Sequence, residues 1–147
     1  MSYIVNEGIL PLPGNWQDQS MNVLMPVLSD IQGTNLVLTR DILPAGSVFP
    51  DYLSTQRKKF RQELPDFTLS LQQSCQIDGR EAEYMEFNWK NQDVTVYQLA
   101  LVIQNNSQVI SLTYTSPKQM PDDNRNQMRN TLHQFRFTQS SERHSAH

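Results

Sequence analysis

Hydrophobic and polar residues alternate over short stretches in the first third of the chain, a period of two that is typical of half-buried β-strands. Residues 3–13, YIVNEGILPLP, predict two short strands with a turn between them. Residues 20–27, SMNVLMPV, place Met21 and Val23 on one face of a further strand. Residues 35–43, NLVLTRDIL, predict the next strand, after which the sequence PAGS breaks the pattern.

The period then changes to that of a helix. Residues 49–65, FPDYLSTQRKKFRQELP, have a proline near their start and another at their end, which suits a helix bounded on both sides. At 100° per residue, Leu53, Phe60 and Leu64 fall within a narrow arc. Gln56 lies inside the same arc, so an amide interrupts the apolar face of the predicted helix.

Four strands with tight connections follow, and a final helix over residues 121–135 closes the folded part. Asp78-Gly79 is a strong signal for a two-residue hairpin turn, and such short connections require antiparallel neighbours. The predicted strands are Phe67–Ile77, Arg80–Lys90, Val94–Gln104 and Gln108–Thr115.

This order of elements predicts an α+β fold, with a single antiparallel β-sheet and the helices packed on one face. The same pattern predicts one domain over residues 1–138, followed by a flexible polar tail over residues 139–147.

The most apolar stretch is VTVYQLALVI, residues 94–103, which is about half the length needed to cross a bilayer. One face of this strand is bulky, and we expect it to face the helices; it carries Tyr97, Leu99, Leu101 and Ile103. The other face is smaller and mildly apolar, and it carries Val94, Val96, Gln98, Ala100 and Val102. A solvated sheet face would normally show charged or hydroxyl side chains, so this second face is unusual for a surface.

The composition of the chain argues against several classes of function. The chain has 147 residues, 37% hydrophobic and 18% charged, and a formal net charge of −3, which does not favour binding to nucleic acid. One cysteine excludes an internal disulfide, and no zinc spacing or cofactor motif is present, so we expect no metal and no cofactor. The N-terminus has neither a basic region nor a long apolar core, which predicts a cytoplasmic protein.

Catalytic chemistry has weak support in the sequence. We interpret His133 as a surface or boundary residue and Cys75 as a small buried one, because no partner for catalysis is evident. The basic segment 57–61, RKKFR, could touch nucleic acid or lipid head groups, but a solvated helix face is the favoured interpretation. Glu81 and Glu83 are interpreted as residues that keep an exposed sheet soluble.

A family resemblance carries more information than these residues do. The segment NEGILPLPGNWQDQSMNVL, residues 6–24, resembles the opening of the EagR family, the effector-associated chaperones of bacterial type VI secretion, which share a fold with DcrB and PsbP. The block Trp16 to Ser20 is its most specific element. LVLTRD, FPDYLSTQ, Trp89 and TSP continue the match in order, over roughly residues 3–135.

The resemblance implies a cytoplasmic homodimer that is not an enzyme and does not itself insert into membranes. Its implied partner is the N-terminal transmembrane region of a PAAR-domain effector, shielded in an apolar groove until export. Carried over by motif, the groove residues are Met21, Val23, Val37, Gln56, Phe60, Leu64, Val94 and Gln98. Phe60 departs from the family pattern, since a small residue there would make a wider groove. A lipid-binding or hydrophobic-ligand-binding module of the same fold is the alternative.

Overall fold

The computed structural model describes residues 2–5, 8–11, 21–26 and 33–138. Its largest element is a six-stranded sheet in the order β3-β4-β8-β7-β6-β5, in which every neighbouring pair is antiparallel. The strands are β3 (Asn22–Leu24), β4 (Asn35–Ile42), β5 (Thr68–Ile77), β6 (Arg80–Asn91), β7 (Val94–Asn105) and β8 (Gln108–Ser116). The predicted meander of β5 to β8 is therefore confirmed, and each end of these four strands lies within one residue of its predicted position. The strand predicted within residues 20–27 is shorter than its pattern, because only Asn22–Leu24 pair with β4.

The two N-terminal strands, β1 (Ser2–Val5) and β2 (Gly8–Pro11), are also present, but they pair with one another in a separate two-stranded sheet. The prediction of a single sheet is wrong in this respect. Alternation identifies a strand, but it does not identify the strand's partner.

Tight turns set the register of the meander. Asp78 and Gly79 both have positive φ, 51° and 77°, as a two-residue type I′ turn between β5 and β6 requires. Gln92 and Asn106 take the same left-handed conformation in the other two turns, each with φ of 58°.

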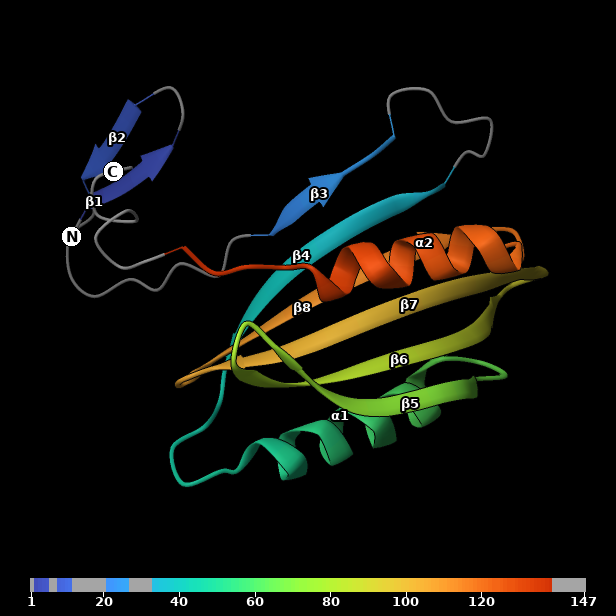
Figure 1. The fold of residues 1–147 in the computed structure, drawn as a ribbon, viewed down its shortest axis with the longest axis horizontal. Coiled ribbons are helices and arrows are strands. Elements are labelled where there is room, and N and C mark those ends of the chain that lie inside the picture. The colour runs from blue at the N-terminus through green and yellow to red at the C-terminus, as the bar shows by residue number, and fades with distance from the viewer. Residues whose placement is uncertain (1, 6–7, 12–20, 27–32, 139–147) are drawn as a thin grey trace.

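The two helices are α1 (Phe49–Glu63) and α2 (Asp122–His133), as predicted from their period and their prolines. They lie on opposite faces of the sheet: in Figure 1, α2 crosses in front of β7 and β8, and α1 lies behind β5. The prediction that both helices pack on one face is therefore wrong.

Packing explains the two-sided arrangement. The bulky face of β7 packs with Leu132 of α2, as predicted, in a core that includes Leu99, Leu101 and Ile103. The smaller face packs with Phe49 and Leu53 of α1, in a second core that includes Met85, Phe87, Ala100 and Val102. Because β7 is apolar on both faces, each face needs a cover, and one helix supplies each.

Candidate functional site

The face of the sheet beneath α1 extends well beyond that helix. One row of directly paired residues crosses five strands, from Val23 through Val37, Thr113 and Ala100 to Met85. Directly opposed residues of antiparallel strands project to the same face. Since Ala100 and Met85 belong to the core under α1, Val37 and Val23 lie on that same face, toward the β3 edge.

α1 covers one side of this face and leaves a hollow beside it of about 380 Å³. The α1 side of the hollow is lined by Tyr52, Leu53, Gln56, Lys59 and Phe60. Its floor and far side are lined by Thr39, Arg40, Asp41, Met85, Ala100, Val102, Ser111 and Thr113. We call this hollow, together with its continuation over Val37 and Val23, the α1-face groove.

Most of the predicted groove residues converge on this region. Gln56 and Phe60 line the hollow directly. Val37 is half-buried in the floor, and Val23, 52% exposed, stands next to it on the edge strand. Met21 directly precedes β3 and is 61% exposed.

Three predicted residues, Leu64, Val94 and Gln98, are not among the residues that line the α1-face groove. Leu64 follows the last residue of α1 and packs against the core beneath the helix. Val94 is on the same face but six positions along β7 from Ala100, which places it about 20 Å away at ~3.3 Å per residue. Phe60 is held in the wall by ring contacts with Phe67 and Phe87, at centroid distances of 6.1 and 5.5 Å.

Gln98 is held in a directed chain of hydrogen bonds. The indole N–H of Trp89 donates to Gln98 Oε1 at 2.7 Å, and Gln98 Nε2 donates to Thr115 Oγ1 at 3.0 Å. An indole nitrogen can only donate, so it fixes the amide oxygen toward Trp89 and the amide nitrogen toward β8. The second N–H of Gln98 and the hydroxyl hydrogen of Thr115 remain as donors at the end of the chain.

The chain belongs to the DcrB family. The family model named DcrB matches residues 7–134, which is most of the sequence. The protein called Effector EagT6 from Pseudomonas aeruginosa is 26% identical over 121 residues, covering 81% of this chain and 84% of that protein. Together these matches confirm the predicted family resemblance.

One solved structure shares the fold of this chain over nearly its whole length. The crystal structure of PA94, a Pseudomonas aeruginosa protein of unknown function, superposes with a TM-score of 0.75 at 23% identity, covering 95% of this chain and 96% of that one. The solution structure of cyanobacterial PsbP from Synechocystis has a TM-score of 0.47 at 13% identity, covering 83% and 92%. The α+β fold class is thereby confirmed by PA94.

A buried ion pair fixes α1 of this DcrB-family domain above the sheet. Both carboxylate oxygens of Glu83 accept from Arg57 Nη1, at 2.9 and 2.7 Å, and Gln72 Nε2 also donates to Oε1 at 2.9 Å. The Glu83 side chain is only 5% exposed. The interpretation of Glu83 as a solubilising surface residue, and of Arg57 as part of a solvated helix face, is wrong. The alternating pattern of the strand placed Glu83 on one face of the sheet, but it did not show that a helix covers that face.

A row of hydroxyl groups in the groove floor escaped the sequence interpretation. Ser111 and Thr113 line the hollow from β8, and Thr39 lines it from β4. The signal was present in the alternating positions of QVISLTYTS, residues 108–116, which put Ser111, Thr113 and Thr115 on one face. The floor is therefore apolar under α1 and hydroxyl-rich beside it.

Reactive chemistry has little support in the described residues. Burial, and next the nearby charge of Glu83, raise the pKa of the Cys75 thiol, which disfavours the nucleophilic thiolate. His133 Nδ1 lies 2.7 Å from the Arg129 carbonyl oxygen, and its ring packs on Tyr84 at 4.9 Å, which suits a boundary residue of α2.

Across the part of the chain that the structure describes, no cluster of metal-binding side chains was found. Among the same residues, no helix is long and apolar enough to span a bilayer.

Proposed function

We propose that this protein is a cytoplasmic chaperone of type VI secretion effectors. In this proposal, the α1-face groove binds the N-terminal transmembrane helices of a PAAR-domain effector and shields them until export. The similarity to Effector EagT6 supports the effector-chaperone assignment. The observation that carries the helix-binding role is the row from Met85 to Val23, which is apolar except for Thr113 and continues past α1 to an edge strand that is exposed on both faces.

The energetics of this role are favourable. A transmembrane helix exposes about 20 apolar residues, which water solvates poorly. Covering roughly 800 Å² of surface on the client side corresponds to a gross gain of about 20 kcal/mol at ~25 cal/mol per Å². Association and side-chain ordering offset a large part of that gain, and the remainder still supports tight binding. Because apolar contacts are not directional, such a groove can accept different client sequences.

Polar side chains on the α1 face of the sheet favour client helices that offer free hydrogen-bond acceptors. The side chains of Gln98 and Thr115 end their hydrogen-bond chain in donors, and a helix carbonyl near a glycine, a serine or a break has spare acceptor capacity. Gln56 lines the opposite wall and can act in the same way. Recognition of main-chain carbonyls adds affinity without reading client side chains.

Replacing Gln98 by Leu should weaken client binding by about threefold to thirtyfold, the equivalent of one or two hydrogen bonds of ~0.6–2 kcal/mol between apolar helices. The measurement is a titration of a 20-residue apolar helix peptide in mild detergent, with Gln104→Leu as the control. Gln104 is also half-buried on β7, but it bonds a turn carbonyl at Asn106 and takes no part in the chain from Trp89 through Gln98 to Thr115. Equal or tighter binding by the Gln98→Leu variant would show that the amide serves only the protein's own Trp89 and Thr115.

We also expect a homodimer, because the family resemblance implies one and because the sheet is more open than an isolated monomer usually leaves it. No particular strand or helix is assigned to the dimer interface. Light scattering at micromolar concentration should give twice the chain mass of 17.0 kDa. A monomer mass at that concentration would reject the dimer without affecting the location of the groove.

The proposed function is tested by isolating the partner. A tagged copy expressed in the native host should co-purify with a PAAR-domain effector, identified by mass spectrometry, and truncation of the effector's N-terminal helices should abolish the association. Recovery of bound lipid in place of any effector would favour the hydrophobic-ligand alternative and overturn the proposal.

A further inference from the structure

The opposite face of the sheet carries a second and larger hollow, of about 760 Å³, beside the end of α2. This volume lies within the ~300–1,000 Å³ range that is usual for binding sites. Its apolar lining is contributed by Leu24, Leu36, Leu38, Ile110, Leu112, Leu132, Phe135 and Phe137. We call it the α2-face groove.

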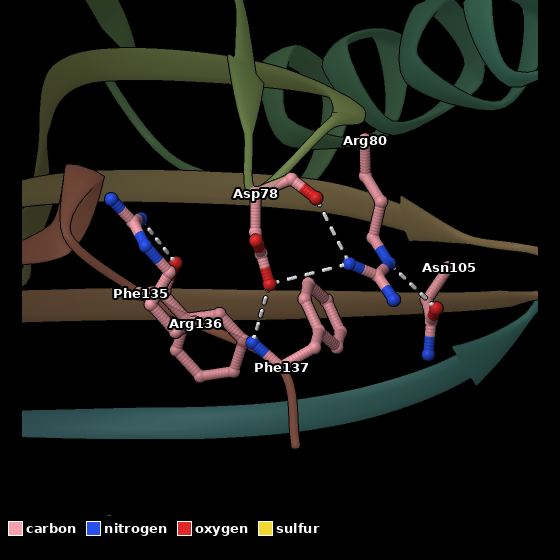
Figure 2. A network of polar contacts seen from close by, with 6 residues as sticks. All are labelled: Asp78, Arg80, Asn105, Phe135, Arg136 and Phe137. Atoms are coloured by element: carbon pink, nitrogen blue, oxygen red, sulfur yellow. Dashed lines mark hydrogen bonds and ion pairs between the residues drawn. The ribbon is translucent and has the colours of Figure 1, made fainter. Parts of the chain in front are cut away.

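One wall of the α2-face groove is the segment that follows α2, and Figure 2 shows how it is fixed. The Asp78 carboxylate accepts a hydrogen bond from the Phe137 main-chain N–H at 2.9 Å. The Arg80 guanidinium lies 3.8 Å from the centre of the Phe137 ring and donates from Nε to Asn105 Oδ1 at 2.9 Å. The rings of Phe135 and Phe137 meet edge to face at 4.9 Å. The wall is therefore tied to the turns at the end of the sheet.

The charge of this groove differs from that of the whole molecule. The exposed Arg136 and the half-buried Arg80 line it, Arg40 stands at the border that it shares with the α1-face hollow, and no carboxylate residue is among the lining residues within the described chain. Asp78, which pairs with Arg80 at 3.5 Å, stands behind the wall. In a chain with a net charge of −3, this is a local concentration of positive charge around an apolar floor. Such a surface complements a segment that combines apolar and acidic side chains.

The two grooves meet at the edge strand β3. Val23 belongs to the α1-face groove, whereas its neighbour Leu24 lines the α2-face groove, and the two side chains are 52% and 60% exposed. Among the strands that the structure describes, none pairs with the outer side of β3, so a bound polypeptide could pass around it. With packed layers ~10 Å from each face, the path is roughly 20–25 Å, or about six to eight extended residues.

We propose that the α2-face groove binds a short acidic and apolar segment of the same client polypeptide, connected to the helix in the α1-face groove by a linker around β3. This inference rests on the proposed function, which supplies the helix. The second contact would anchor the client in one direction along the sheet, which apolar contacts alone cannot specify. Linking the two contacts raises the apparent affinity through a high effective concentration of the second segment.

Three synthetic peptides test this inference by titration in mild detergent at low salt. The first is a 20-residue apolar helix alone. The second carries the same helix, an eight-residue Gly-Ser linker and the segment Glu-Leu-Glu-Leu-Phe-Glu. The third has lysine in place of each glutamate. We expect the acidic extension to tighten binding by about tenfold, with a gain that shrinks in high salt, and the lysine extension to give no gain.

Two variants show which residues are responsible for the increase in affinity that the acidic extension gives. Arg136→Gln and Leu24→Ser should each remove most of it while binding the helix-only peptide normally, because both residues line only the α2-face groove and are exposed. Lys118→Gln removes an exposed charge that does not line the groove, and it should keep the full gain. If the helix-only peptide binds but neither extension adds affinity, or both add equally, this inference is overturned and the proposed function stands. If the helix-only peptide fails to bind, the proposed function is overturned, and this inference with it.

Discussion

Val23→Asp should abolish client binding while leaving the protein folded. Val23 is 52% exposed on the three-residue edge strand β3, so the fold loses little buried apolar surface when it changes. A bound helix would have to bury the new carboxylate against apolar side chains, which costs several kcal/mol unless the charge is paired. A loss of at least ~100-fold in affinity follows from a cost of about 3 kcal/mol. The measurement is a titration with the helix-only peptide, supported by co-purification of the effector.

A matched control distinguishes the effect of a carboxylate inside the groove from the effect of one more negative charge elsewhere on the surface. Val48 is 56% exposed and immediately precedes α1, where a carboxylate suits the helix N-terminus. Val48→Asp should therefore bind clients as the unmodified protein does. Val94→Asp, at 51% exposure, measures how far along β7 the client reaches. Normal client binding by Val23→Asp would show that the groove is misplaced.

Arg57→Leu should destabilise the fold by about 3 kcal/mol, because it leaves the Glu83 carboxylate buried without its cation. For a chain of this size the melting temperature should fall by about 6–12 °C. Lys58→Leu, the adjacent exposed position, should leave it almost unchanged. Thermal unfolding followed by circular dichroism provides the comparison.

The double variant Arg57→Leu with Glu83→Leu tests the cause of that loss. Replacing both charged partners with apolar residues removes the uncompensated charge, so most of the lost stability should return. A double variant as unstable as Arg57→Leu alone would mean that the arginine contributes through packing and not through its charge. Because the pair fixes α1 over β6, a stable double variant also shows whether the ion pair is needed for the groove wall to bind clients.

Local patterns were enough to predict most of the fold. Alternation and turn chemistry placed the meander to within one residue, because Asp78-Gly79 favours a type I′ turn and each register follows from its turn. Period and proline positions placed both helices. The face that each helix covers was not predictable in this way, since β7 is apolar on both faces and accepts a helix on either.

Alternation predicted which residues of one strand share a face, whereas the family resemblance grouped residues of different strands into one groove. The observed strand pairing puts Val23, Val37 and Gln98 on one face of the sheet. Pairing of Trp89 with Gln98, or of Arg57 with Glu83, depends on how strands align and on how α1 sits. The distance of Val94 from the hollow likewise depends on where α1 crosses the sheet.

The most direct test of the helix-binding role is a methyl NMR experiment with a protonated 20-residue apolar helix peptide and deuterated, methyl-labelled protein in mild detergent. We predict intermolecular nuclear Overhauser effects from the peptide to the methyl groups of Val23, Val37 and Thr113, which share one row of the α1-face groove. Methyl groups of Leu132 and Leu112, in the core under α2, should show none. Contacts confined to other methyl groups, with none at Val23, Val37 and Thr113, would contradict the proposal that this groove binds the client helix.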